Sequence, residues 1–509
     1  YYPNHSVWAC GNKIHSSGIN LVLSPWNFPI AIPIGGVLAS LAAGKRVILK
    51  PSQNAAATAY TISKCLWDSG IPKDAFAFLP CEESILDDFL SSGNVFDAVI
   101  LTGGTDTAQF LLRRNPHLNL HAETGGKNAT IVTALSDREQ AITNVVNSAF
   151  GNSGQKCSAT SLLILEKEVF EDKEFRVLLK DAAESIKVGN PWDFSTKIGP
   201  LAVPINNKIK HVLNNTKNQE WLLKPKQKGN QILSPGIKWG ISKKDFEYNN
   251  ELFGPILCVM KANDLNEAIE LANGTPFGLT NGIETLSIDE INHWKNKITA
   301  GNLYANRSTT GAIVERQPFG GMKASSFGFG MKAGGPNYVL QFINFEPEKT
   351  SLSNIEKNFS KIYEEHFSRE TDSSKIRGQH NIFRYLKAKK ILILSDKKTK
   401  NEYLNIVLTA CKVLNIPFDH IVLNDYFASN NNYNLNHLLD HIGDETIIRS
   451  LVSSLPEDFV KNCHKKSLHI YNKTPIANGR FELLNYLKEQ SLSINYHRYG
   501  NLMGETSID

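Results

Sequence analysis

One cysteine in a glycine-rich run is the residue of this sequence with the clearest chemical potential. Cys157 stands in residues 151–158 (GNSGQKCS). A cysteine thiolate is a strong nucleophile and can attack the carbon of an aldehyde. The two glycines before it, Gly151 and Gly154, allow the close approach of backbone to ligand that a reactive loop needs. The run therefore indicates a covalent step at Cys157 rather than an inert, buried thiol.

Three other segments place a polar side chain among glycines, prolines or aromatic residues. They are residues 24–29 (SPWNFP), 123–127 (ETGGK) and 251–255 (ELFGP). The amide of Asn27 can stabilise an oxyanion through a fixed N–H, and the carboxylate of Glu123 can activate water for thioester hydrolysis. A hydride that leaves such an adduct needs a nicotinamide acceptor. Together these groups suit the oxidation of a carbonyl compound.

Alternating apolar strands and helical segments must position these motifs. Predicted strands at 19–23, 46–50 and 98–101, with helices at 32–43 and 55–68, indicate a parallel, doubly wound sheet. A second α/β unit follows, with strands at 129–133, 161–166 and 298–306 and helices at 139–149, 175–186 and 265–273. Residues 310–338 are rich in glycine, which predicts loops.

A polar and charged stretch, 346–380, predicts a linker with one helix. The chain after it predicts a third α/β unit. Its expected strands are 390–395, 420–423 and 467–471, its helices 402–414 and 481–490, with an edge strand at 493–497 and a loop at 430–434.

Composition narrows the class of protein. The 509 residues include 55 Lys+Arg and 50 Asp+Glu, a net charge of +5, with 41% hydrophobic residues, which excludes collagen-like, disordered and disulfide-scaffold classes. So small an excess of positive charge does not indicate nucleic-acid binding. Seven cysteines without a CxxC pair favour a reducing compartment, and we expect a cytoplasmic protein. The sequence shows no apolar run of the ~18 residues that a membrane span needs, and His437 and His441 lack a third metal ligand, so we expect no span and no metal.

The four motifs, with Glu123 and Cys157 separated by 157 − 123 = 34 residues, resemble the aldehyde dehydrogenase superfamily over about residues 21–345. The resemblance implies an α/β fold with a doubly wound cofactor domain and an α/β catalytic domain. It implies that Cys157 is the nucleophile and Glu123 the general base. Asn27 and the Cys157 backbone N–H would form the oxyanion hole.

The same resemblance implies NAD as the cofactor. Lys50 would contact the adenosine ribose, the turn 102–104 would face the pyrophosphate, and Glu251 would bind the nicotinamide ribose. Members of the family often have Ser where this chain has Gly104 and an acidic residue where it has Gln53; a neutral amide does not repel a 2′-phosphate, so NADP stays open. The expected cofactor-binding residues are Lys50, Ser52, Thr102, Gly103, Gly104, Glu251 and Phe253.

Three downstream segments narrow the resemblance: residues 306–312 (NRSTTGA), 317–321 (QPFGG) and 332–336 (KAGGP). With Ser158 they look like the Δ1-pyrroline-5-carboxylate dehydrogenases, also called glutamate semialdehyde dehydrogenases, above all the domain found in proline utilization A proteins. Two backbone donors and a hydroxyl make a compact anion cradle. By resemblance, Ser158 and the N–H groups of Gly311 and Ala312 would hold the substrate carboxylate, with Phe28 and Phe319 beside its aliphatic part.

The resemblance also implies partners and domains. Relatives have a long portion before residue 24, where this chain has 23 residues and begins without Met, so we expect a truncated chain. We expect a homo-oligomer, a small-molecule substrate and a fused or separate proline dehydrogenase. Segments 378–381 and 498–501 resemble the region after the dehydrogenase domain in some proline utilization A-like proteins. The expected segments are an incomplete NAD-binding domain (1–122), a catalytic domain (123–309), a substrate-anchor loop with a return or oligomerisation segment (310–345), a linker (346–380) and a C-terminal α/β accessory domain (381–509).

The sequence thus predicts NAD-dependent oxidation of L-glutamate γ-semialdehyde to L-glutamate in proline catabolism. Two alternatives stay open. One is an aldehyde dehydrogenase for another carboxylate-bearing aldehyde. The other is a non-catalytic relative that serves a structural or binding role, although a binding module does not need Asn27, Glu123 and Cys157 together.

Overall fold

The computed structural model describes residues 13–15, 17–91, 95–215, 220–346, 350–430, 435–443 and 445–496. The chain forms two compact units, and each is built from several segments. Unit 1 contains Tyr1–Thr124, Ser326–Thr371 and Arg384–Glu489, and unit 2 contains Gly125–Ser325, Asp372–Phe383 and Gln490–Asp509. The motif expected at 498–501 and most of the loop expected at 430–434 lie outside the described residues.

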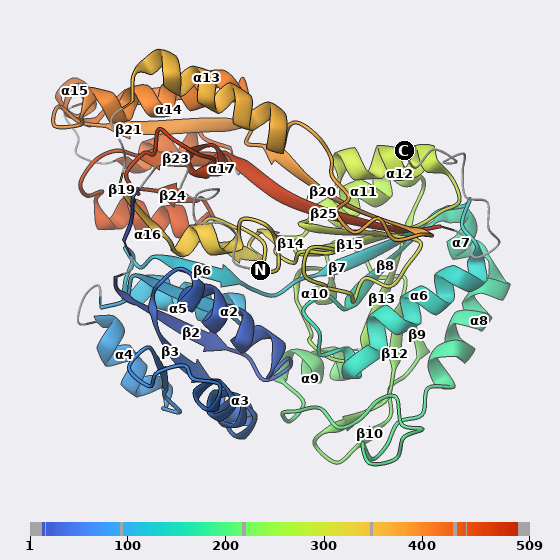
Figure 1. The fold of residues 1–509 in the computed structure, drawn as a ribbon. Helices are drawn as coiled ribbons and strands as arrows, with labels where there is room; N and C mark the ends of the chain where they lie inside the picture. The colour runs from blue at the N-terminus through green and yellow to red at the C-terminus, as the bar shows by residue number, and fades with distance from the viewer. Residues whose placement is uncertain are drawn as a thin grey trace. The chain divides into compact units, whose positions relative to one another are not determined.

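Unit 1 contains a six-stranded sheet in the order β18-β6-β5-β2-β3-β4, parallel except at β18. Leu21 and Leu23 of β2 pack into one hydrophobic cluster, while Val22 between them packs into another. The sheet is therefore buried on both faces, which explains the nearly continuous apolar runs in its strands. Helices α2 and α3 lie beside β2 and β3 (Figure 1). The elements are β2 (Ile19–Ser24), α2 (Ala31–Ala42), β3 (Arg46–Pro51), α3 (Ala56–Asp68), β4 (Phe76–Phe78), α4 (Glu83–Ser91), β5 (Ala98–Thr102), α5 (Thr105–Arg114), β6 (Leu120–Glu123) and β18 (Ser326–Phe327).

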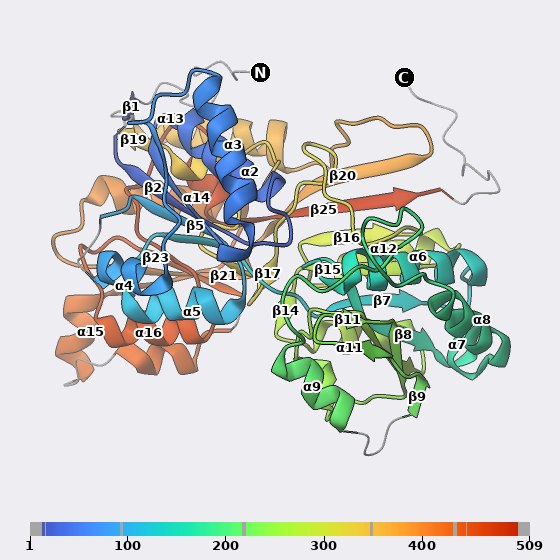
Figure 2. The same cartoon turned by 90° about the horizontal axis from the view of Figure 1, so that it is seen from below.

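A second sheet of unit 1 comes from the C-terminal third of the chain. Its four parallel strands follow the order β22-β21-β23-β24. Its helix α16 packs against α5, where His464 Nε2 lies 2.9 Å from the Pro116 carbonyl oxygen (Figure 2). The predicted C-terminal α/β element is confirmed, and its core joins the cluster of the first sheet. Its elements include α13 (Leu352–Ile362), β21 (Lys390–Ser395), α14 (Asn401–Leu414), β22 (Phe418–Val422), α15 (Leu423–Asn430), β23 (Thr446–Ser450), α16 (Glu457–Lys465), β24 (Ile470–Tyr471) and α17 (Phe481–Leu484).

Unit 2 is built on a nine-stranded sheet in the order β20-β25-β16-β15-β7-β8-β13-β12-β9. Helices α6 and α8 share one hydrophobic cluster with the sheet, and α9, α11 and α12 share another. Aspartates at 137, 172 and 264 accept backbone N–H bonds at the starts of α6, α8 and α11, which satisfies donors that a helix end leaves open. The elements are β7 (Asn128–Val132), α6 (Arg138–Phe150), β8 (Thr160–Glu166), α8 (Lys173–Glu184), α9 (Asn207–Asn214), β9 (Glu220–Leu223), β12 (Gly236–Trp239), β13 (Ile256–Ala262), α11 (Leu265–Asn273), β15 (Thr280–Glu284), α12 (Ile288–Lys297), β16 (Asn302–Ala305), β20 (Gln379–Lys387) and β25 (Leu487–Asn495).

The end of the chain differs from its prediction. The helix expected at 481–490 stops at Leu484 as α17, and β25 begins at Leu487. The strand expected at an edge instead lies inside the nine-stranded sheet, between β20 and β16, and β20 had not been predicted. Glu489, Gln490 and Ser491 are buried polar residues, so no apolar alternation marks β25. No described helix has the length and apolar character that spanning a bilayer requires.

Candidate active site

The predicted site residues are divided between the two units. Unit 1 holds Asn27, Phe28, Lys50, Ser52, Thr102, Gly103, Gly104 and Glu123, and unit 2 holds Cys157, Ser158, Glu251, Phe253, Gly311, Ala312 and Phe319.

In unit 1 the predicted residues gather at the carboxyl ends of parallel strands. Lys50 pairs with Leu23 near the end of β2, and Thr102 pairs with Glu123. Asn27 and Phe28 are half-buried in the loop that joins β2 to α2. Ligands of open α/β sheets bind beyond these strand ends, so the structure brings this part of the predicted site to the expected edge.

Gly103 and Gly104 form the turn between β5 and α5. Gly104 is the N-cap residue of α5, with φ −74° and ψ 150°. A β-carbon built on it would lie 3.9 Å from Thr107 Oγ1, its closest neighbour, whereas one on Gly103 would lie 3.3 Å from Leu101 Cδ1. The start of α5 therefore has open space beside N–H groups that favour a phosphate. This turn fits a cofactor pyrophosphate.

Glu123 ends β6 and is half-buried. Its carbonyl accepts a bond from Gly103 N at 3.2 Å, and Ser326 Oγ donates a long bond of 3.5 Å to its Oε1. The carboxylate thus stands at the same strand edge as the turn of Gly103 and Gly104.

In unit 2 the loop that carries the predicted nucleophile Cys157 (the nucleophile loop) follows α6 with three residues in left-handed conformation. Asn152 and Ser153 each have φ 56°, and Gly154 has φ 67°. A β-carbon on Gly154 would lie 2.3 Å from the carbonyl oxygen of Gly254, so glycine lets this loop pack directly on residues 251–255. The structure thereby joins two motifs that are almost 100 residues apart in the sequence.

Side-chain amides and hydroxyls hold the backbone around Cys157. Asn128 Nδ2 donates to the carbonyl oxygens of Cys157 and Ala159, at 2.6 and 2.9 Å. Thr309 Oγ1 donates to the Ser158 carbonyl at 3.0 Å. The half-buried Cys157 is therefore fixed through its backbone. Sequence reasoning missed Asn128, although it directly follows the segment 123–127.

The same bond from Thr309 ties the nucleophile loop to the predicted carboxylate anchor. Tyr304 Oη donates to the Gly311 carbonyl at 2.7 Å, and Ile313 and Gln317 close a short antiparallel bridge. Ala312 is exposed, while Gly311 and Phe319 are half-buried. Ser158, Gly311 and Ala312 thus lie on two loops that unit 2 connects.

Glu251 lies against the backbone of the segment 123–127. Gly126 N donates to its Oε1 at 3.0 Å, and a β-carbon on Gly125 would lie 2.1 Å from its Oε2. The residue is half-buried, yet desolvation of its carboxylate raises the pKa to about 7, opposed by the Gly126 bond and by the charges of Lys208 and Lys127. Phe253 has φ 55°, a strained conformation of the kind that occurs at ligand sites.

Three of the other described cysteines, Cys258, Cys411 and Cys463, are buried, whereas Cys157 is half-buried. Burial raises the pKa of Cys258 to about 11 and the pKa values of Cys411 and Cys463 to about 12. These buried thiols stay protonated and unreactive at neutral pH. Among the described residues, no three His, Cys, Asp or Glu side chains form a group that could hold a metal ion.

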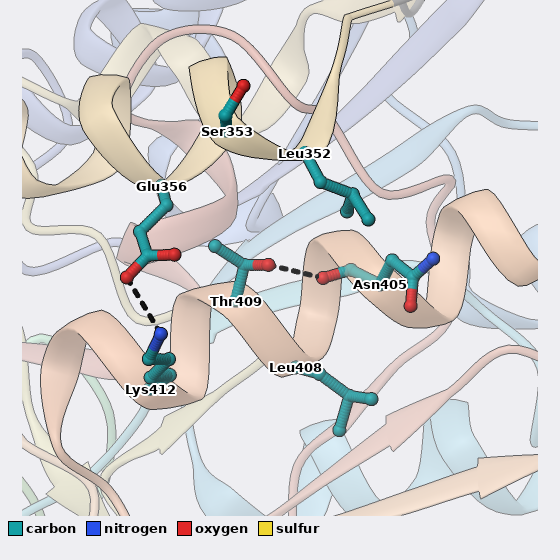
Figure 3. Close-up of a pocket in the computed structure, with 7 residues that line it drawn as sticks. All are labelled: Leu352, Ser353, Glu356, Asn405, Leu408, Thr409 and Lys412. Carbon is teal, nitrogen blue, oxygen red and sulfur yellow. Dashed lines mark hydrogen bonds and ion pairs between the residues drawn. The ribbon is translucent and has the colours of Figure 1, made fainter.

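A surface pocket of unit 1 lies between α13 and α14 and contains none of the predicted site residues (Figure 3). Its polar groups bond to one another: Lys412 Nζ pairs with Glu356 Oε1 at 2.8 Å, and Thr409 Oγ1 donates to the Asn405 carbonyl at 2.7 Å. The arrangement offers no nucleophile or cluster of acids.

Residues 13–346 match the model of the aldehyde dehydrogenase family, and the chain belongs to that family. The match confirms the resemblance on which the predicted α/β fold was based. The C-terminal residues after 346 lie outside it.

Individual relatives show which members of the family the chain resembles. It is 36% identical over 349 residues to 1-pyrroline-5-carboxylate dehydrogenase of Staphylococcus aureus (strain JH1), covering 64% of this chain and 65% of the relative. Proline utilization A from Corynebacterium freiburgense superposes with a TM-score of 0.86 at 34% identity, covering 96% of this chain and 51% of that one. A Thermus 1-pyrroline-5-carboxylate dehydrogenase with bound NAD gives a TM-score of 0.61 at 32% identity, covering 65% of each chain. The chain therefore spans about half to two thirds of these relatives.

Proposed function

We propose that this chain catalyses NAD-dependent oxidation of L-glutamate γ-semialdehyde, the ring-opened form of Δ1-pyrroline-5-carboxylate, to L-glutamate in proline catabolism. The observation that carries the proposal is the bond from Thr309 to the Ser158 carbonyl, which joins a nucleophile loop to an expected carboxylate anchor. The named relatives support the same substrate.

In the proposed reaction Cys157 Sγ attacks the aldehyde carbon, and a C–S bond forms. The Asn27 amide and the Cys157 N–H stabilise the oxyanion. Ser158 with the N–H groups of Gly311 and Ala312 binds the α-carboxylate, with Phe28 and Phe319 beside the aliphatic chain. A nicotinamide held by the cofactor residues would supply the acceptor for the hydride that leaves the adduct carbon as the thioester forms. Glu123 then takes a proton from water, whose oxygen attacks the thioester and releases the Cys157 thiolate and glutamate.

For the cofactor we propose NAD. The open space at Gly104, beside the start of α5, supports a pyrophosphate there. The hydrogen bond from Gly126 N fixes the Glu251 carboxylate, which supports a ribose contact. Gln53 carries no charge that would repel NADP, so the assay below compares both cofactors. The proposed cofactor residues are Lys50, Ser52, Thr102, Gly103, Gly104, Glu251 and Phe253.

The wider setting is also a proposal. We infer a cytoplasmic homo-oligomer that receives substrate from a fused or separate proline dehydrogenase. The coverage of 51% of a proline utilization A chain supports a larger assembly, and the free thiols of the six described cysteines support a reducing compartment. We also propose that the chain divides by function into five segments, with boundaries after residues 122, 309, 345 and 380.

The test measures NADH formation by the full-length protein. Pyrroline-5-carboxylate should drive NAD reduction much faster than succinate semialdehyde, and NADP should be the poorer acceptor. Cys157→Ala should abolish turnover, while Cys65→Ala, at an exposed cysteine, should not. A rate no higher with pyrroline-5-carboxylate than without it would end the substrate claim, and full turnover by Cys157→Ala would end the mechanism.

A further inference from the structure

A lysine of β25 lies near a serine that contacts the proposed general base. Lys488 is in β25, within the part of that strand that belongs to unit 1. A β-carbon built on Gly330 would lie 3.9 Å from Lys488 Nζ and 3.6 Å from Ser326 Oγ. Ser326 Oγ in turn lies 3.5 Å from Glu123 Oε1. Lys488 and Ser326 therefore flank the space that the missing side chain of Gly330 leaves open, and Ser326 connects this space to Glu123.

The neighbouring acid on β25 is engaged elsewhere. Adjacent residues of a strand point to opposite faces, so Glu489 points away from Lys488. Glu489 Oε2 accepts a bond from Lys332 N at 2.6 Å, and its Oε1 accepts one from Asn337 Nδ2 at 2.8 Å. Lys488 is thus left with Glu123 as its acidic neighbour in the described part of unit 1.

The charges around Glu123 agree with this geometry. Burial lowers the pKa of Lys488 to about 8, and the Glu123 carboxylate opposes the change. Burial also lowers the pKa of Lys332, again opposed first by Glu123 and then by Glu489. Burial, followed by the Glu123 charge, raises the pKa of Tyr338, which stays neutral. Two buried lysines are therefore close enough to interact electrostatically with Glu123, and one of them, Lys488, comes from outside the family-matched residues 13–346.

We propose that Lys488 is a positioning residue for the proposed hydrolysis step: its ammonium keeps the Glu123 carboxylate ionised and directed toward the attacking water. The inference rests on the proposed role of Glu123. It gives the C-terminal region a part in the chemistry. An opposite charge favours the ionised form of a carboxylic acid, and its removal should raise the pKa of Glu123.

The test separates acylation from hydrolysis with p-nitrophenyl acetate, which acylates a reactive cysteine without any aldehyde or cofactor. In the full-length protein, Lys488→Met should keep the initial burst of p-nitrophenol. The steady-state rate of p-nitrophenol release by this variant should fall about tenfold at low pH. The reason is that the acid limb of its pH–rate profile shifts to higher pH by about one unit. Lys488→Arg keeps the positive charge, so its acid limb should lie at the same pH as that of the wild type. Lys412→Met, at an exposed lysine of α14, should behave as the wild type.

A second experiment distinguishes an effect on Glu123 from a general loss of folded protein. In a Glu123→Gln background, Lys488→Met should cause no further slowing, because the base on which it acts is gone. An unchanged acid limb in Lys488→Met, or equal losses in the Met and Arg variants, would overturn the inference. A wild-type protein without a burst would overturn it together with the nucleophile. Failure on pyrroline-5-carboxylate with a normal burst would instead end the substrate proposal alone.

Discussion

The two sheets of unit 1 are both built mainly of parallel strands joined by helices. They differ in their polar groups, which are open to a ligand at the end of one sheet and bonded to one another at the end of the other. In the six-stranded sheet, the turn after β5 leaves open space at Gly104 beside the start of α5. In the four-stranded sheet, the turn after β21 folds on itself. There Asp396 Oδ1 accepts bonds of 2.9 Å from Lys398 N and Thr399 Oγ1, and Ser395 Oγ lies 2.8 Å from His420 Nε2.

The charged residues of the two sheets also differ in whether they are paired within the protein or stand at a strand end. Arg449 in β23 is fully buried, and its guanidinium pairs twice with Glu482 at 3.0 Å. Its remaining bonds go to the carbonyls of Tyr471 and Lys473. In the first sheet Glu123 ends a strand, half-buried, at the edge where a ligand would bind. A shared strand–helix architecture therefore does not decide function; the polar groups at the strand ends do.

The largest effect should come from Glu123→Gln. The amide keeps the size of the side chain but cannot accept a proton, so hydrolysis should fall by about 10²–10⁴-fold. Stopped-flow measurement should show one fast turnover of NADH followed by a stalled acyl-enzyme. Glu356→Gln, at the exposed partner of Lys412, serves as the control. Steady turnover within twofold of wild type would remove Glu123 from the mechanism.

In the second sheet, Arg449→Met should damage stability rather than chemistry. The change leaves Glu482 buried without its cation, a loss of about 3–5 kcal/mol. Urea unfolding should show the loss, while kcat per folded molecule stays unchanged. Arg449→Met combined with Glu482→Leu should lose less than the single variant, because no unpaired carboxylate remains. A larger loss in the double variant would contradict this account.

Lys50→Met should weaken cofactor binding. Loss of one hydrogen bond from a charged donor, worth about 1.5–3 kcal/mol, should raise the KM for NAD at least about tenfold with little change in kcat. Initial rates at varied NAD provide the measurement. Lys64→Met, at an exposed lysine of α3, is the matched control. Equal KM values for the two variants would exclude Lys50 from the cofactor site.

Gly104→Ser should give the smallest change, and in the opposite direction. The φ of −74° suits any residue, and the space allows a hydroxyl to reach a phosphate. One added hydrogen bond of about 0.5–1.5 kcal/mol should lower the KM for NAD a few-fold. Gly104→Ala separates the hydroxyl from the added carbon. Equal effects of Ser and Ala would contradict a phosphate contact.

Local patterns were enough to predict much of the fold. Helix α11 (Leu265–Asn273) and strand β21 (Lys390–Ser395) begin and end where predicted, because α11 has apolar residues at helical spacing and β21 is a short continuous apolar run. Of strand β25, only residues 493–495 lay within a predicted strand, because the buried polar residues before them give no apolar pattern. Gln490 Nε2 donates to the Ala300 carbonyl at 2.8 Å, and Ser491 Oγ to Asn302 Oδ1 at 3.1 Å, so distant partners make its burial favourable.

The site shows the same limit. Residue types and spacing suggested Cys157 and Glu251, and their roles stay predictions. The contacts that hold them were not predictable. Asn128 reaches the Cys157 carbonyl and Gly126 reaches Glu251 across 29 and 125 residues of sequence. Such contacts depend on how strands are ordered in the sheet, which a local pattern does not contain.

The position of β25 also sets an order of events in the cell. Its Ser491 pairs with Asn302 of β16, 189 residues earlier in the chain. At about 5–20 residues per second, a ribosome needs roughly 10–40 s to make that interval. Until then β16 lacks this neighbour, and an unpaired strand edge invites association with other chains. Translation speed between β16 and β25 should therefore govern the yield of folded protein, because β25 can join the sheet of unit 2 only after these residues have been made.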